Sequence, residues 1–530
     1  MKRALAAAAF FATFATVPCS ADDQPSLVVH TKLGPVQGVL AHDGAAQRWL
    51  GIPYAAPPIG ALRWRAPQPH LPWSETLVAD HFGAPCVQIG TLYGPPPAGK
   101  EWGLANVEAF GKPVGREDCL TLNVWRPNTD ANELPVLVFV HGGGGVAGYS
   151  GDPAYEASKL AIAANAVVVT VNMRLGVFAS FVHPALASDP LSNSGHFGLL
   201  DVVQALHFVH DNAAAFGGDP GNVTLSGESA GAIAVYMTMA SPLAEGLFHK
   251  AIVMSGLFGN PPPKEKALAF SNDLVSRLVV QDGLSSQPAD VKQYLLSKRA
   301  DDILAVIWRD KLRGSPMPGD DLVLPVDIEA AFEQGRYNRV PTMVGTTREE
   351  AKLLSSGFQI GDAERFTIMQ TPELARSATF ADLVKPYFLP SLGPSIFNAY
   401  MRGLTWLLMT GVESSVRKLS MHAPAVYRYR FDWDHQPEPW HTVYGACHAI
   451  DLPFLFDNFD HNFFAPFFND RNRAGAEALS ARFVQSIATF MRTGDPNPAN
   501  VEPRWPKWTQ ESPQRFVLDA NDTAAQISIQ

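Results

Sequence analysis

The sequence lacks the features that several protein classes require. Of 530 residues, 17% are charged and four are cysteines, while 46% are apolar, which excludes a disordered or fibrous chain. The formal charge is −10 and no lysine and arginine cluster stands out, so binding of nucleic acid or an anionic membrane has no electrostatic basis. No apolar run reaches the ~20 residues that span a bilayer. Zinc-like cysteine and histidine spacings and phosphate-binding loops are also absent, so we expect neither a metal nor an organic cofactor.

The N-terminus has the pattern of a secretory signal peptide. A basic pair precedes an apolar run at 4–17, and small residues follow it before two aspartates. We predict that residues 1–21 are removed, that 22–530 form one domain, and that the protein is exported to the periplasm or the extracellular space. A lipid anchor on Cys19 is the alternative, although Pro18 before it fits that processing poorly.

The cysteines that remain after such a cleavage indicate one disulfide. Cys86 and Cys119 are 33 residues apart in a stretch rich in glycine and proline, and an exported protein can keep a disulfide. We predict that these two form a bridge. Cys447, beside His448, is then a small buried thiol, and a catalytic thiol is the alternative.

A change of pattern along the chain predicts the fold class. Short β-type runs separated by glycine and proline fill the first hundred residues and indicate antiparallel strands. Later runs are apolar on both faces and alternate with helical segments, which is typical of central strands in a mostly parallel sheet covered by helices. We expect a doubly wound α/β architecture with helical insertions near 261–324 and 362–418. The continuous runs are Leu122 to Trp125, Val136 to Val140, Val167 to Val171, Val223 to Ser226 and Ala251 to Met254.

The most specific local motif is Gly-x-Ser-x-Gly at 227–231. It directly follows the apolar run 223–226 and precedes the helical run 232–240. A serine on a strand-to-helix turn has a tight backbone that admits only small neighbours, and its hydroxyl projects above the sheet at the helix N-terminus. We therefore identify Ser229 as a candidate nucleophile, with a structural turn serine as the alternative.

A glycine string, H-G-G-G-G at 141–145, follows the strand run 136–140. Acyl transfer develops negative charge on the carbonyl oxygen, and preorganised backbone N–H groups lower the barrier by roughly 3 to 4 kcal/mol each. Glycines let the backbone approach that closely. We predict an oxyanion hole made by Gly143, Gly144 and the N–H of Ala230.

With these motifs the chain resembles the type-B carboxylesterase and cholinesterase family of α/β-hydrolases. Three strings in family order carry the resemblance, which covers nearly the whole chain after the leader: G-I-P-Y-A-A-P-P-I-G-A-L-R-W-R-A-P at 51–67, E-D-C-L-T-L-N-V-W-R-P at 117–127 and F-G-G-D-P-G-N-V-T-L-S-G-E-S-A-G at 216–231. The resemblance implies the α/β-hydrolase fold and a serine esterase that works through an acyl-enzyme without a cofactor.

The resemblance also implies the partners of the nucleophile. A serine hydroxyl needs a histidine to take its proton, and the histidine needs an acid to set its tautomer. The family's acid lies five residues after a glycine that ends a buried strand, which assigns Glu350, with Glu349 as the alternative in a shifted register. The family segment G-A-x-H-x-x-D-L-P-F matches 445–454 and assigns His448 as the general base, with His441 as its competitor. Activity should rise with pH near the unperturbed histidine pKa of ~6.5 unless the acid shifts it.

Other charged residues in the matched strings resemble structural groups of the family. Arg63 with Glu117, and Arg174 with Asp219, match positions of buried ion pairs. Glu228, beside the nucleophile, has two interpretations: it could order water or repel anionic substrates, or it could be a hydrogen-bonded turn residue.

The substrate pocket departs from the family pattern. Where the family usually has an aromatic residue after the glycine string, this chain has Gly145 and then Val146, so we expect an open wall that admits a bulkier acyl or alcohol group. By analogy with relatives, Trp102 and Tyr93 in the Cys86/Cys119 loop would line the mouth. The sequence predicts neither the natural ester nor the oligomeric state.

Two rival functions remain at this point. The family also includes noncatalytic recognition domains, but those lack one or more triad residues and this chain has all three. Cleavage of amides, thioesters or polyesters by the same site is the enzymatic rival.

Overall fold

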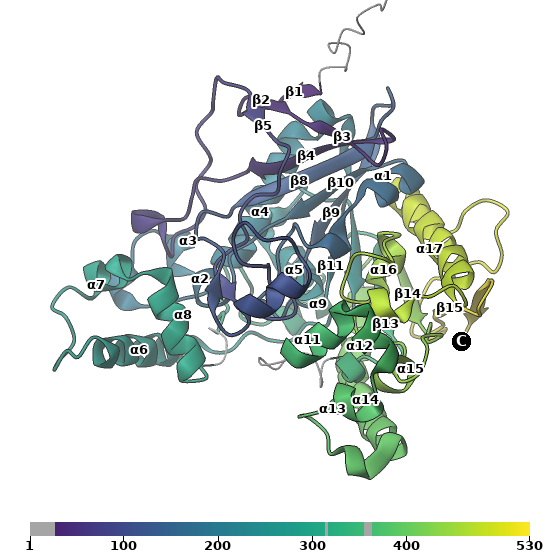
Figure 1. The fold of residues 1–530 in the computed structure, drawn as a ribbon. Coiled ribbons are helices and arrows are strands. Elements are labelled where there is room, and N and C mark those ends of the chain that lie inside the picture. Colours follow the sequence, from purple (N-terminus) through teal and green to yellow (C-terminus); the bar gives the residue numbers. More distant parts are fainter. Residues whose placement is uncertain (1–26, 313–315, 354–362) are drawn as a thin grey trace, which may run out of the picture.

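The computed structural model describes residues 27–312, 316–353 and 363–530, so the predicted leader and Cys19 lie outside the described residues. An 11-stranded sheet forms its centre, in the order β16-β15-β14-β13-β12-β11-β9-β10-β8-β4-β3 (Figure 1). Its strands are β3 (Val39–Ala41), β4 (Ala46–Pro53), β8 (Thr121–Pro127), β9 (Leu134–Val140), β10 (Val167–Val171), β11 (Gly218–Glu228), β12 (Lys250–Met254), β13 (Thr342–Thr347), β14 (Val426–Phe431), β15 (Phe516–Ala520) and β16 (Ala525–Ile529).

The sheet is parallel in its middle and antiparallel at its edges. Neighbouring strands are parallel from β10 through β9, β11, β12, β13 and β14 to β15. The N-terminal strands β3, β4 and β8 pair antiparallel on one side, and β16 does so on the other. Two small sheets complete the N-terminal part, formed by β1 (Val28–His30), β2 (Pro35–Gln37) and β5 (Leu77–Val78), and by β6 (Gln88–Ile89) and β7 (Pro113–Val114).

Both faces of the sheet are covered by helices, as the sequence predicts. Alternate residues of β9 enter different cores: Val138 lies in one buried cluster, and Leu137 and Phe139 lie in the other. Helices α4 (Phe197–Asn212) and α5 (Ala230–Ala240) contribute to the first cluster, and α1 (Ser158–Ala164) and α17 (Arg473–Thr493) to the second. Burial on both faces is the reason why the central strands read as continuous apolar runs.

The two segments expected as insertions are helical. The first contains α6 (Lys264–Gln281), α7 (Val291–Ser297) and α8 (Ala300–Arg309); the second contains α11 (Ala363–Gln370), α12 (Pro372–Ser377), α13 (Phe380–Val384) and α14 (Gly393–Ser420) (Figure 1). Short helices fill other connections: α2 (Gly176–Ala179), α3 (Pro190–Asn193), α9 (Ile328–Glu333), α15 (Trp440–Val443) and α16 (Leu452–Leu455). Within the described ranges, no helix is both long and apolar enough to cross a membrane.

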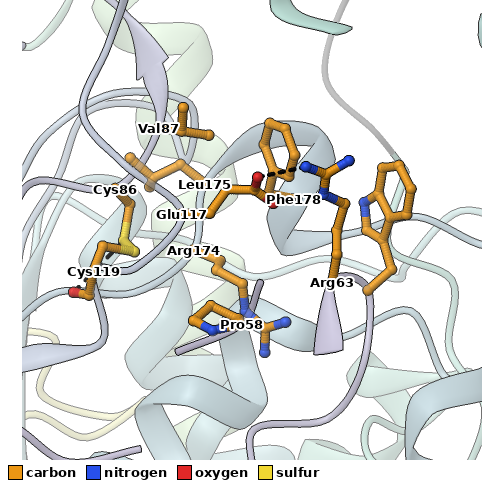
Figure 2. A pocket seen from close by; sticks show the side chains of 10 residues that line it. Pro58, Arg63, Cys86, Val87, Glu117, Cys119, Arg174, Leu175 and Phe178 are labelled. Atoms are coloured by element: carbon orange, nitrogen blue, oxygen red, sulfur yellow. Dashed lines mark hydrogen bonds and ion pairs between the residues drawn. A yellow bond between two sulfur atoms is a disulfide. The ribbon is translucent and has the colours of Figure 1, made fainter. Parts of the chain in front are cut away.

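A disulfide and an ion pair secure the loop region beside the sheet (Figure 2). The predicted Cys86–Cys119 bridge is present. Close to it, Nε and Nη2 of Arg63 donate to the two carboxylate oxygens of Glu117 at 2.6 and 2.5 Å, so the expected pair forms in a bidentate geometry. The third nitrogen of Arg63 donates to the carbonyls of Leu295 and Lys298 and thereby connects this loop to the end of α7.

The second expected ion pair, Arg174 with Asp219, is wrong. Arg174 donates to both oxygens of Asp201 on α4, at 2.8 and 2.6 Å, and both side chains are buried. Asp219 lies at the beginning of β11 and accepts the amide of Gly221. Arg174 follows the carboxyl end of β10, and because β10 and β11 run in the same direction these two positions are at opposite ends of the sheet.

We expect Asp201→Ala to lower the free energy of unfolding by about 3 to 5 kcal/mol, because it leaves Arg174 buried without its counter-ion. Asp219→Ala removes a partly exposed carboxylate and should cost less than about 1 kcal/mol. Denaturant unfolding of both variants measures the difference. Equal losses, or a larger loss for Asp219→Ala, would contradict the observed pairing.

Candidate active site

Ser229 occupies a sharp turn between the end of β11 and the beginning of α5. Its φ is 56°, in the left-handed region, and its N–H donates to the carbonyl of Met254 at 2.9 Å. A Cβ on Gly227 would lie 2.5 Å from the carbonyl of Gly231, and a Cβ on Gly231 would lie 2.0 Å from the carbonyl oxygen of Val140. The turn therefore requires glycine at both positions, which is the physical reason for the Gly-x-Ser-x-Gly pattern.

The glycine string after β9 lies directly beside this turn. A Cβ on Gly142 would be 3.1 Å from Cβ of Ser229, and Gly143 and Gly144 have φ values of 103° and 66°. The carbonyl of Gly143 accepts the N–H of Ala147 at 3.0 Å, which holds the loop in a tight turn. Ser229 and Gly143 line one cavity; Gly144 and Ala230 are their neighbours in the chain.

His448 lines the same cavity as Ser229 and contacts Glu350. Its Nδ1 lies 2.5 Å from Oε2 of Glu350, and both side chains are buried. The other oxygen of Glu350 accepts the hydroxyl of Ser255 at 2.7 Å and the N–H of Thr347 at 2.8 Å. Burial alone would raise the pKa of Glu350, but the charge of His448 and these hydrogen bonds hold it below its usual value. A proton on Nδ1 is thus bound by a carboxylate, which leaves Nε2 to exchange protons.

A second carboxylate lies on the other side of the imidazole. Oε1 of Glu228 is 3.1 Å from Nε2 of His448, and Glu228 is buried. Burial raises the pKa of Glu228 to about 8. Burial would lower the pKa of His448, but Glu228 and Glu350 raise it to about 9. Sequence reasoning left the place of Glu228 open, because its position beside Ser229 says nothing about the distance to His448.

Asp451 is a further buried carboxyl group that raises the pKa of His448, and sequence reasoning assigned it no role. It is fully buried and accepts the hydroxyl of Tyr429 at 2.8 Å, and burial raises its pKa to about 7. Tyr429 lies on β14 opposite Gly345 of β13, where a Cβ would be 1.8 Å from the tyrosine ring. Asp451 is part of the family segment at 445–454, but that motif does not indicate which residue the aspartate contacts.

The alternative residues lie elsewhere. Glu349 contacts Lys352 at 2.7 Å and accepts the N–H of Ala446 at 3.1 Å. His441 is 46% exposed in its side chain, and its Nδ1 lies 2.6 Å from the carbonyl oxygen of Asp434. These contacts place neither residue beside Ser229.

Cys447 is a buried free thiol, and burial raises its pKa well above the usual value. The thiol therefore stays protonated at neutral pH, which favours the structural interpretation over a catalytic one.

The cavity at Ser229 has an aromatic wall. Of the predicted pocket residues, Glu228 and Trp102 line it together with Tyr93, whereas Gly145 and Val146 do not. Val146 is 48% exposed, and among the described residues no atom lies within 4 Å of a Cβ placed on Gly145. Within the described residues, no group of three histidine, cysteine or acidic side chains could hold a metal ion. The other aromatic lining residues are Tyr155, Phe463 and Phe464.

Comparison with known proteins agrees with this geometry. The sequence model of the Carboxylesterase family matches residues 25–529. The para-nitrobenzyl esterase of Bacillus subtilis (strain 168) is 33% identical over 505 residues, covering 94% of this chain and 95% of the relative. The fumonisin B1 esterase of Sphingopyxis macrogoltabida is 31% identical over 510 residues, covering 93% of this chain and 86% of the relative. A solved PNB esterase is similar with a TM-score of 0.70 and 30% identity, covering 95% of this chain and 97% of that structure.

Both the family match and the similarity to these relatives extend over nearly the whole chain. The similarity of the fold extends equally far, and it includes the mixed sheet with helices on both sides. The chain therefore belongs to the carboxylesterase family of α/β-hydrolases and is a carboxylic-ester hydrolase.

Proposed function

We propose that the protein is an exported serine carboxylesterase in which Ser229, His448 and Glu350 form the catalytic triad. The observation that carries the proposal is the 2.5 Å contact between Nδ1 of His448 and the Glu350 carboxylate, beside the cavity that Ser229 lines. A buried carboxylate that orients an imidazole is the arrangement a general base requires.

The reaction proceeds in two halves. Oγ of Ser229 attacks the ester carbonyl while Nε2 of His448 takes the hydroxyl proton, and the N–H groups of Gly143, Gly144 and Ala230 stabilise the oxyanion. The C–O bond to the alcohol then breaks, and His448 returns the proton to the leaving oxygen. Water attacks the acyl-enzyme by the same route and releases the carboxylic acid, which regenerates the serine hydroxyl.

Glu228 is proposed to set the proton affinity of the base. Its carboxyl faces Nε2, the nitrogen that exchanges protons, whereas Glu350 faces Nδ1. The protonated imidazole formed during each half-reaction is therefore placed between two carboxyl groups. This stabilises the imidazolium but also retains a proton on His448 until a higher pH.

The Cys86–Cys119 disulfide supports export, because such bonds persist in oxidising compartments. We further propose that residues 1–21 are a leader and that 22–530 form one α/β-hydrolase domain. The proposed reaction uses neither a metal nor an organic cofactor. The name of the Bacillus subtilis relative makes para-nitrobenzyl esters suitable first substrates.

Ser229→Ala should abolish turnover of p-nitrophenyl and p-nitrobenzyl esters, with kcat reduced at least ~10,000-fold, because no acyl-enzyme can form. The matched control is Ser226→Ala: this buried hydroxyl three residues earlier has no hydrogen-bond partner within the described ranges, and its loss should leave kcat nearly unchanged. Rapid-mixing kinetics should show a nitrophenol burst in the wild type. A folded wild type without ester turnover would favour a noncatalytic recognition domain.

The pH profile tests the role of Glu228. Because the pKa of His448 is raised to about 9, kcat/KM should rise with pH through the alkaline range instead of levelling near 7. Glu228→Gln removes one of the two carboxylates and should move the midpoint to lower pH. Asp152→Asn removes another carboxyl group on the cavity wall and should leave the midpoint in place. An unchanged midpoint in Glu228→Gln would refute the proposed role.

The open wall beside the glycine string should admit bulky esters. Gly145→Phe should lower kcat/KM for bulky acyl or alcohol groups relative to acetate esters by ~10-fold or more, because it fills that space. Gly145 has a φ of 70°, so Gly145→Ala reproduces the backbone strain without the bulk and should preserve the ratio. If large-ester turnover by Gly145→Phe stays normal, the wall does not govern acyl or alcohol size.

A further inference from the structure

Helix α14 and the turn before it expose a row of large apolar side chains. Figure 1 shows α14 at the lower edge of the molecule, next to α13. Contiguous apolar patches of more than a few hundred Å² on a folded protein mark sites of interaction. The exposed residues are Leu389 (68%), Leu392 (46%), Ile396 (51%), Tyr400 (54%), Trp406 (70%) and Leu407 (61%).

The exposed residues of α14 follow coiled-coil spacing. Steps of four and three residues connect Ile396, Tyr400, Gly403, Leu407, Thr410 and Ser414 along one side of the helix. The opposite side packs into the protein, where Phe397, Met401, Val412 and Val416 are buried. The helix thus has two apolar faces, and among the described residues only one of them is packed against the rest of the protein.

The row from Ile396 to Ser414 is called the seam of α14, and the composition around it is unusual for a surface helix. Among residues 386–412, Arg402 is the only charged residue, and Glu413 follows at the next position. The side chain of Glu413 is 41% exposed, and its Oε1 lies 2.8 Å from Nη2 of the buried Arg428. Arg402 and Glu413 are three turns apart and lie on the same flank of the seam.

We propose that this face of α14 binds the same face of a second copy of the chain, as an antiparallel helix pair about a two-fold axis near Leu407. Such an interface is self-complementary, since each copy supplies the same patch. Antiparallel pairing about that axis places Arg402 of each copy near the partner's Glu413. Gly403 and Thr410 are small enough to let the two helices approach closely at the centre.

The exposed apolar area is close to that of a standard dimer interface. Tyr400 and Trp406, at about half to two-thirds exposure, offer on the order of 100 to 170 Å² each. With the four aliphatic side chains, the patch approaches the ~800 Å² per partner that a standard interface buries. A lipid surface fits less well, because helices that lie on membranes carry several lysines or arginines beside the apolar face, and this chain has Arg402 alone within 386–412.

Sedimentation of the purified protein from ~0.1 to ~50 µM tests the proposal, since this range brackets a micromolar dissociation constant. We expect the wild type to approach twice the chain mass and Leu407→Glu to remain monomeric, with its dissociation constant raised at least ~100-fold. The matched control is Leu71→Glu, which places the same charge on an exposed leucine (79%) outside α14 and should dimerise normally. Arg402→Glu should weaken the dimer, and Arg402→Lys should retain it.

Cross-linking tests the direction of the helices. Ile396 lies near the beginning of α14, Met421 directly follows its end, and each is 51% exposed. A protein with both Ile396→Cys and Met421→Cys should therefore form intermolecular disulfides, while each single variant should not. The cysteines of the proposed mature chain interfere little, because Cys86 and Cys119 are bonded and Cys447 is buried, and Cys19 belongs to the proposed leader. Efficient cross-linking of either single variant would indicate a parallel pair and overturn the arrangement.

Three other outcomes would overturn the proposal. The first is a wild type that stays monomeric over the whole range. The second is a dimer that Leu407→Glu leaves intact, since it would use a different surface. The third is a monomer that floats with phosphatidylcholine vesicles, which would assign the face to lipid. All variants should retain wild-type ester hydrolysis, so a failure of the interface is distinguishable from a failure of the catalytic proposal.

Discussion

The turn at Ser229 is the constraint on which the site depends. A left-handed serine between a strand and a helix is strained, and it persists only because β11 is held on both sides by β9 and β12 and because glycines remove every Cβ from the contact. The loops after β9, β11 and β13 emerge at the same edge of the parallel sheet. They bring Gly143, Ser229 and Glu350 together, although more than 200 residues separate the first from the last.

Buried carboxyl groups in an apolar core determine the electrostatics of this site. Glu228 and Asp451 have raised pKa values because burial disfavours their charged forms, and the same burial strengthens their effect on His448. Each ring nitrogen of the His448 imidazole faces a carboxyl group. The two carboxyl groups stabilise the protonated form of the His448 imidazole over the neutral form, which is why its pKa is raised.

The N-terminal loops form part of the cavity wall and are held in place by a disulfide and an ion pair. Tyr93 and Trp102 lie between the bridged cysteines and line the cavity, and the nearby Arg63–Glu117 pair connects the same region to the carbonyls at the end of α7. Arg174 and Asp201 brace the sheet edge against α4 in a similar way. These contacts fix the conformation of an irregular, glycine-rich region beside the cavity.

The sequence alone determined the features that are local in the chain. Four of the five apolar runs predict parallel strands correctly, namely β9 to β12, whereas the run at 122–125 lies in β8, which pairs antiparallel with both neighbours. The glycine pattern around Ser229 predicts a strand-to-helix turn. Both signals depend on neighbouring residues. The sequence alone could not show that Arg174 pairs with Asp201, because strand direction decides which charged residues lie at the same edge of the sheet. The position of Glu228 over Nε2 of His448 was decided by tertiary structure for the same reason. Distances between residues far apart in sequence follow from the packing of sheet and loops, and these distances set the pKa values.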